Sequence, residues 1–137
     1  MKYFDYSTPG AYFVTLCEKN RIPCLGNIKN GKMLLNKFGK IVQDKWEWLF
    51  IHYKHVAIDE YIIMPDHFHA IIHIFDHGGK PIPELIGAFK TMSSKKIHLE
   101  GFKEFKWQRS YYDRIIRNDE SLNSIREYIQ NNPQNIR

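Results

Sequence analysis

Two histidines, His67 and His69, are the residues in this sequence whose type and spacing most directly suggest chemistry. They open the segment 67–74, in which apolar residues occupy every second position. This alternation is typical of a β-strand with one face in the core, and a strand directs residues i and i+2 to the same side. Two imidazoles placed side by side can bind one metal ion, although a stable site needs further ligands. The ordinary alternative is that the pair belongs to a strand surface in a chain with seven histidines.

A second pair of polar residues, Tyr128 and Asn132, lies near the C-terminal end. The segment 122–132 carries apolar residues at helical spacing, and residues four apart on a helix lie one above the other. If this helix packs over the histidine strand, Asn132 can offer an amide oxygen as a third metal ligand and Tyr128 can face the bound group. The alternative is that Tyr128 packs against the core and Asn132 caps the helix before Pro133.

These four side chains together would suit chemistry on a phosphodiester. A metal held by two imidazoles and an amide oxygen keeps open positions and can act as a Lewis acid on a phosphate oxygen. A tyrosine hydroxyl that attacks the phosphorus would retain the bond energy in a phosphotyrosine and release a 3′-hydroxyl. Rejoining would then need no ATP.

The remaining segments predict the elements that would position these residues. A β-branched and aromatic run predicts a strand, helical periodicity predicts helices, and Pro65–Asp66 predicts a turn. The order strand, helix, strand, strand, helix, strand, helix indicates an α+β sandwich of ferredoxin-like (RRM-like) type. Its sheet would be antiparallel, its helices mainly on one face, and the histidine strand central. The predicted strands are 11–18, 55–64, 67–74 and 105–111, and the predicted helices are 32–50, 81–99 and 118–133.

Length, charge and cysteine content restrict the class of protein. The chain has 137 residues, which predicts one domain over residues 1–137, and its two cysteines are too few for a disulfide scaffold. No segment has the length of a membrane span and no signal peptide is recognisable, so we expect a cytoplasmic protein without a membrane partner. A net charge of +5 with 15% aromatic residues favours a polyanion, and suits single-stranded nucleic acid in particular.

Three separated motifs resemble one known family. His67-Phe68-His69 within residues 64–72 resembles the His-hydrophobic-His (HUH) motif of single-tyrosine transposases of insertion sequences. Residues 107–117 are similar to a segment typical of the REP-associated tyrosine transposases, and residues 128–133 resemble the tyrosine helix of that family. Residues 12–15 fit as well, so the resemblance extends over nearly the whole chain.

This resemblance implies an HUH-type fold and a metal-dependent DNA transposase. Such an enzyme cleaves and rejoins single-stranded DNA at hairpin-forming sequences through a 5′-phosphotyrosine intermediate. Tyr128 would be the nucleophile, and His67, His69 and Asn132 would bind a divalent metal, Mg or Mn. Imidazole ligands suit zinc as well.

The resemblance also implies partners and a location. The basic side chains Lys90, Lys95, Arg109 and Arg114 are candidates for DNA contacts. Relatives occur as monomers and as swapped dimers, which leaves a homodimer open, and the expected location is the bacterial cytoplasm in association with the nucleoid.

Three alternatives follow from the same residues. Tyr111 and Tyr112 are rival tyrosines in the predicted strand 105–111 and just after it. A non-catalytic module that binds single-stranded nucleic acid, as a degenerate or domesticated transposase would, needs no nucleophile. A metal-dependent hydrolase could use His73 together with the other two histidines of its strand face and a water molecule as nucleophile.

Overall fold

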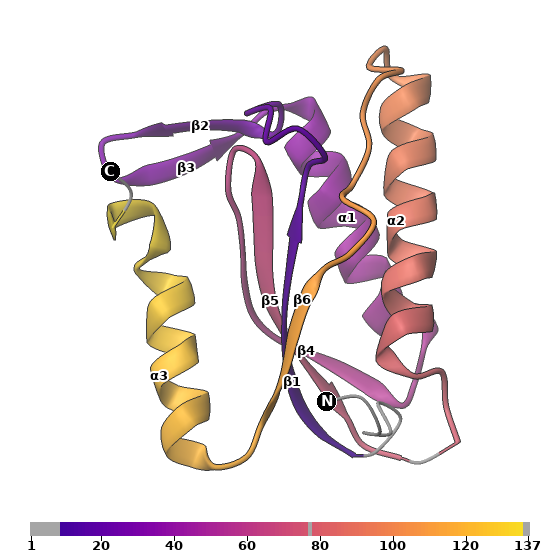
Figure 1. The fold of residues 1–137 in the computed structure, drawn as a ribbon, viewed down its shortest axis with the longest axis vertical. Coiled ribbons are helices and arrows are strands. Elements are labelled where there is room, and N and C mark those ends of the chain that lie inside the picture. The colour runs from indigo at the N-terminus through magenta and orange to yellow at the C-terminus, as the bar shows by residue number, and fades with distance from the viewer. Residues whose placement is uncertain (1–8, 77, 136–137) are drawn as a thin grey trace.

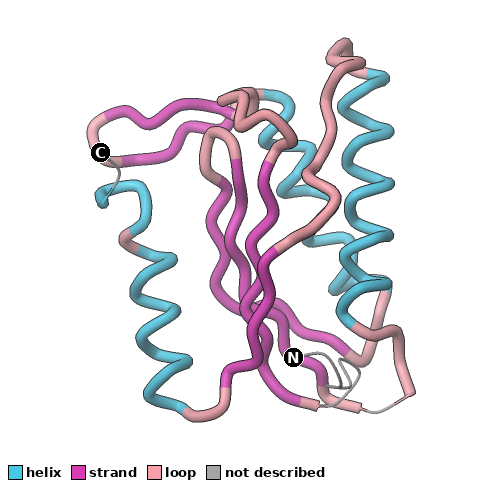
Figure 2. Tube along the Cα trace, in the orientation of Figure 1, coloured by secondary structure: helices cyan, strands magenta, loops and turns pink. Residues whose placement is uncertain are grey.

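A four-stranded antiparallel sheet forms the centre of the computed structural model, which describes residues 9–76 and 78–135 (Figures 1 and 2). The order across the sheet is β4–β5–β1–β6, so the histidine strand β5 is central, as predicted. The prediction of one domain over residues 1–137 extends beyond the described residues. The strands of the sheet are β1 (Gly10–Cys17), β4 (Val56–Ile63), β5 (His67–Ile74) and β6 (Tyr112–Ile116).

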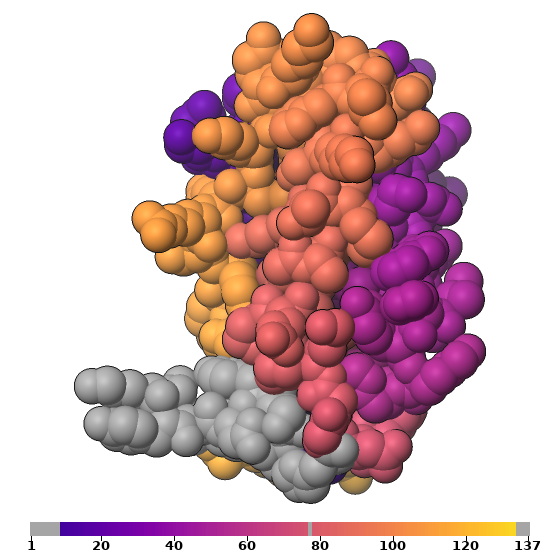
Figure 3. Space-filling model, turned by 90° about the vertical axis from the view of Figure 1, so that its right-hand side faces the viewer, coloured from indigo at the N-terminus to yellow at the C-terminus, as the bar shows by residue number. Residues whose placement is uncertain are grey.

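Two helices, α1 (Lys37–His52) and α2 (Ile82–Leu99), cover one face of the sheet. Figure 3 shows the side of the molecule that they form. The core of this layer is aromatic, because Trp46 of α1 packs edge-on against Phe68 of β5 and Phe89 of α2, with ring centroids 4.8 and 5.2 Å apart. Edge-to-face rings bury large apolar area at favourable geometry, so this cluster fixes the helices on the sheet.

The third helix, α3 (Asp119–Gln130), lies on the opposite face of the sheet (Figure 1). Its buried residues Ile125 and Ile129 form a smaller apolar cluster with residues of β1, β5 and β6. In β5, Phe68 and its alternate neighbours face α1 and α2, whereas Ile71 faces α3. The two faces predicted for this strand are therefore confirmed. We call the side that carries His67, His69 and α3 the histidine face.

The helix predicted over residues 32–50 begins later than expected, at Lys37. Residues Lys32–Leu35 form β3 instead, which pairs with β2 (Gly26–Lys29) as a separate hairpin (Figure 2). The turn residues Asn30 and Gly31 both have positive φ, 54° and 74°, as a two-residue hairpin turn requires. The helix then starts where the side chain of Asn36 accepts the backbone N–H groups of Phe38 and Gly39.

The strand predicted over residues 105–111 is wrong. The alternation of Phe105 and Trp107 reflects packing against the helical layer, where the Trp107 indole N–H donates to Ser93 at 2.9 Å. The β-pairing of this segment is an isolated bridge between Trp107 and Glu18, which is too short to form a strand. The edge of the sheet is occupied by the next segment, β6. None of the helices within residues 9–76 and 78–135 is long and apolar enough to cross a membrane.

Candidate active site

His67 and His69 lie side by side on the histidine face, with ring centroids 4.9 Å apart. Each ring is held through its Nδ1 atom, His67 by Asp66 Oδ1 at 2.6 Å and His69 by Thr15 Oγ1 at 2.8 Å. An ionised carboxylate only accepts hydrogen bonds, so His67 donates from Nδ1 and keeps its Nε2 lone pair when the ring is neutral. A His69 ring that donates from Nδ1 to the Thr15 hydroxyl does the same. Metal-binding histidines are typically oriented in this way by a partner on the other ring nitrogen.

Electrostatics favours the metal-binding protonation states at neutral pH. Burial, assisted by the nearby charges of His67 and Arg21, lowers the pKa of His69 to about 4. His69 is therefore neutral at pH 7, as a metal ligand must be. Burial alone would raise the pKa of Asp66, but the hydrogen bonds that this carboxylate accepts from His67 and Arg21 outweigh burial and lower its pKa. Asp66 thus stays ionised and orients the His67 ring.

Tyr128 of α3 contacts His69 of this histidine pair directly. Its ring meets the ring of His69 edge-on, with centroids 5.4 Å apart, and half of the Tyr128 surface remains exposed. On another side, Phe13 of β1 stacks on His69 at 5.7 Å. The structure therefore brings together three of the four residues singled out from the sequence, in agreement with a helix packed over the histidine strand.

Helix α3 is fixed in this position by polar contacts to β4. Strand β4 has an irregularity between Ile58 and Tyr61, so that two residues, Asp59 and Glu60, lie opposite one residue of β5. Such a bulge redirects side chains. The Asp59 carboxylate accepts two hydrogen bonds from Arg126 of α3, at 3.0 and 2.6 Å. The Glu60 carboxylate accepts a further hydrogen bond from Gln130 of α3 at 2.7 Å. These contacts determine where Tyr128, two residues after Arg126, can lie.

Acid should weaken this attachment, and Asp59→Asn tests the effect. Burial raises the pKa of Asp59, but hydrogen bonds from Arg126, the Glu60 backbone and His73 outweigh burial and place the pKa far below that of an ordinary carboxyl group. A carboxyl group with a lowered folded-state pKa stabilises the fold above its unfolded pKa, about 3.9, and loses that contribution as the pH falls toward its folded pKa. We therefore expect Asp59→Asn to lower the free energy of unfolding by about 1–2 kcal/mol at pH 7 and by less at pH 3.

Urea unfolding at the two pH values measures this difference. Asp44→Asn is the matched control, because Asp44 is exposed on α1 and its ion pair with Lys45, at 3.7 Å, is long. An equal loss of stability for Asp59→Asn at pH 7 and pH 3 would contradict the assignment.

Asn132 lies beyond the end of α3, which stops at Gln130, three residues before the end of the predicted helix. After the C-cap Asn131, the chain tightens into a short 3-10 helix, η1 (Asn132–Asn135), and Asn132 is buried with 9% of its surface exposed. Within residues 9–76 and 78–135, no three His, Cys, Asp or Glu side chains are grouped so that they could hold a metal ion. Among these residues, a third ligand for the histidine pair would therefore have to be of another type, and the role of Asn132 stays a prediction.

The trio of histidines considered for a hydrolase does not form a site among the described residues. His73 lies six residues after His67 on one strand, about 20 Å along it. Its Nε2 bonds to Asp59 at 2.6 Å. His73 thus belongs to the contacts that hold α3.

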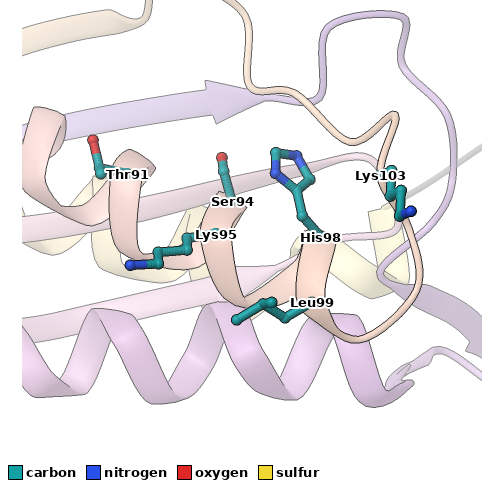
Figure 4. A pocket seen from close by; sticks show the side chains of 6 residues that line it. All are labelled: Thr91, Ser94, Lys95, His98, Leu99 and Lys103. Atoms are coloured by element: carbon teal, nitrogen blue, oxygen red, sulfur yellow. The ribbon is translucent and has the colours of Figure 1, made fainter.

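The four basic candidates lie in different parts of the molecule. Lys90 donates to the carbonyls of Gln108 and Arg109, at 2.8 and 3.2 Å, and burial lowers its pKa. Lys95 lines a hollow of about 540 Å³ on α2 (Figure 4), in the helical layer behind the sheet. The Arg109 side chain is exposed in the loop before β6. Arg114 alone is placed on the histidine face, since it pairs with Phe13 across β1 and β6.

Sequence reasoning did not identify Thr15 and Asp66 as parts of the site. Thr15 reaches His69 because β1 and β5 pair antiparallel with these two residues directly opposite each other. The signal for Asp66 was its place directly before His67, and the signal for Thr15 was a polar residue in an otherwise apolar central strand. Only the register of the strands shows that this hydroxyl meets a histidine.

Comparisons with known proteins agree with this fold and site. Residues 11–132 match the model of the family described as "Transposase IS200 like". An uncharacterised protein of Haemophilus influenzae is 35% identical over 97% of this chain and 85% of its own length.

Two solved structures share the fold. A REP-associated tyrosine transposase bound to a REP hairpin has a TM-score of 0.73 at 21% identity, over 98% of this chain and 73% of its own. A transposase candidate from Deinococcus radiodurans has a TM-score of 0.60 at 17% identity, over 90% of this chain and 91% of its own. The α+β fold and the resemblance inferred from the three motifs are confirmed, and the chain belongs to the IS200-like transposase family.

Proposed function

We propose that this protein cleaves and rejoins single-stranded DNA beside hairpins through a 5′-phosphotyrosine intermediate on Tyr128. The observation that carries this proposal is the contact between the ring of Tyr128 and His69, one of two histidines whose Nδ1 atoms are held by other side chains. A nucleophile beside a metal-binding pair is the arrangement that phosphodiester transfer requires. Both parts come from one chain, in keeping with one catalytic domain over residues 1–137.

The side chains at the site fit a divalent metal, which this family generally uses. His67 and His69 would hold the ion through Nε2, and we assign Asn132 as the third ligand because it follows Tyr128 by four residues and is buried. The mixed nitrogen and oxygen set favours Mn or Mg over a thiolate-preferring metal. When bound, the metal would act as a Lewis acid on the phosphodiester.

The protein itself supplies the nucleophile and its orientation. The Tyr128 oxygen loses its proton and forms a bond to the phosphorus. The bond between phosphorus and the 3′ oxygen breaks, and the 3′ oxygen gains a proton. The phosphotyrosine keeps the bond energy, so attack by a 3′-hydroxyl reverses the step without ATP. Arg126 and Asp59 hold α3 so that the ring of Tyr128 stays beside His69.

A DNA hairpin is the proposed partner. The structural neighbour of highest similarity described above is a transposase bound to a REP hairpin. The net charge of +5 favours binding to the phosphate backbone. Arg114 on the histidine face is the basic candidate placed to contact DNA near Tyr128, and Arg109 lies in the loop that leads to the same strand.

Removal of divalent metal tests the proposal. We expect purified protein mixed with a single-stranded hairpin oligonucleotide to form a covalent adduct in Mg or Mn, none in EDTA, and an adduct again after metal is restored. Denaturing gels detect the adduct, and peptide mass spectrometry identifies the attached residue. Hairpin binding without any adduct in either metal would contradict the proposal and favour a non-catalytic module that binds single-stranded nucleic acid.

A further inference from the structure

Two residues of β6, Tyr112 and Arg114, extend the histidine face beyond the residues used so far. In the antiparallel pair of β1 and β6, Tyr112 lies opposite Thr15 and Arg114 lies opposite Phe13. Directly paired residues project to the same side of a sheet, so both side chains share the face of His69. We call these two residues the β6 platform.

Aromatic rings connect the β6 platform to the proposed nucleophile. The ring of Tyr112 meets Phe13 edge-on with centroids 6.2 Å apart, and Phe13 stacks on His69 at 5.7 Å. His69 in turn contacts Tyr128 at 5.4 Å. Phe13 is buried, whereas Tyr112 is exposed, so a nucleic acid strand that presents a phosphate to Tyr128 can place a neighbouring nucleotide over Tyr112.

The β6 platform is accessible and is not explained by packing. Helix α3 packs mainly against β4 and β5. Strand β4 forms one edge of the sheet and β6 forms the other edge. Tyr112 is 54% exposed, although large aromatic side chains are usually well buried. Arg114 is exposed, and its guanidinium makes no hydrogen bond or ion pair with any residue in the described part of the chain.

We propose that the β6 platform binds the single-stranded nucleotides beside the phosphate that Tyr128 attacks, with a base stacked on Tyr112 and a backbone phosphate on Arg114. This inference rests on the proposed function and specifies how the same site holds its substrate. Single-stranded DNA fits these two side chains, because its unpaired base can stack on the aromatic ring of Tyr112 and its phosphate can pair with the exposed guanidinium of Arg114. The continuity of the ring contacts with the histidine pair favours this occupant over a second protein.

Binding in EDTA tests the inference without interference from cleavage. Two fluorescent oligonucleotides are compared by anisotropy, a hairpin with a single-stranded flank and the same hairpin without it. We expect Tyr112→Ala to weaken binding of the flanked hairpin by about 5- to 100-fold, the effect of losing one stacked base, and to leave the unflanked hairpin unchanged. Tyr112→Phe should bind the flanked hairpin as the wild type does, because the stacking ring remains.

Two further variants sharpen the experiment. Arg114→Gln should reduce the slope of log K against log salt by about 0.7 for the flanked hairpin, as expected for one lost contact with a single-strand phosphate. Phe75→Ala is the matched control, because Phe75 is another exposed aromatic residue, 58% exposed, at the opposite end of β5 from His67. Its affinity for both oligonucleotides should equal that of the wild type.

Equal affinity of Tyr112→Ala and wild type for the flanked hairpin would overturn the inference. Loss of the covalent adduct in Tyr112→Phe would overturn it as well, because Tyr112 would then act through its hydroxyl. These outcomes are separate from a failure of the proposed function. A wild-type protein that forms no adduct, while its flank binding still depends on the Tyr112 ring, would refute the chemistry and support the platform.

Discussion

Replacement of Tyr128 by phenylalanine is expected to abolish covalent attachment of DNA, with cleavage reduced by at least about 10⁴-fold, while DNA affinity is nearly unchanged. The change removes only the hydroxyl oxygen. The ring that contacts His69 remains, and Ile125 and Ile129 still bury the same face of α3. Denaturing gels measure the adduct, and anisotropy in EDTA measures the affinity.

The rival tyrosines provide matched controls for this prediction. Tyr111→Phe should retain the adduct, because the ring of Tyr111 faces the ammonium of Lys90 at 5.4 Å and is packed against the helical layer. Tyr112→Phe should retain it too, since Tyr112 contributes its ring and not its hydroxyl. Cleavage by Tyr128→Phe at the wild-type rate, or an adduct mapped to either rival, would contradict the assignment of the nucleophile.

Replacement of His69 by alanine is the second change with a large expected effect. Loss of an outer contact to a metal ligand typically reduces affinity or activity by 10- to 100-fold, so loss of the ligand itself should reduce cleavage by at least about 100-fold. His69 has a central place because it contacts Thr15, His67, Phe13 and Tyr128. Electron paramagnetic resonance of Mn²⁺ would show weaker metal binding, whereas hairpin binding in EDTA should persist.

A graded series separates the effect of the proposed metal ligand His69 from that of the residues that orient the two histidines. Thr15→Val removes the partner of His69 Nδ1, and Asp66→Asn replaces the charged partner of His67 Nδ1 by a neutral amide. Each should cost about 10- to 100-fold in metal affinity. His52→Ala is the control, because His52 is exposed at the end of α1 and stacks on Trp48 far from the site. Unchanged Mn²⁺ binding in His69→Ala would show that the metal lies elsewhere.

Local sequence was sufficient to predict the central part of the site. The alternation in residues 67–74 correctly assigned the two faces of β5, because side chains on a strand alternate with a period of two. The apolar stripe of α3 likewise predicted which side of the helix faces the sheet, and Tyr128 lies on the flank of that stripe beside His69. Periodic patterns of this kind depend on neighbouring residues only, and they remain visible without a structure.

The wrongly predicted segments are those whose hydrophobic pattern is compatible with two different structures. The aromatic alternation at Phe105 and Trp107 satisfied the rule for a strand, but burial against α2 produces the same alternation. Residues 32–35 continued the helical periodicity of α1, and their pairing with β2 outweighed it. In both cases a contact between segments decided the outcome, and propensity alone could not.

What the sequence alone determined is the set of chemical groups and the elements that carry them: two histidines on one strand face, a tyrosine on an amphipathic helix, and a basic, aromatic-rich chain. The tertiary structure decided how those groups meet. The register of β1 against β5 places Thr15 on His69, the bulge in β4 aims Asp59 at Arg126, and β6 presents Tyr112 at the open end of the same face. Such pairings join residues 50 to 100 positions apart. The register between strands and the packing of α3 on the sheet select them, and no local pattern encodes either.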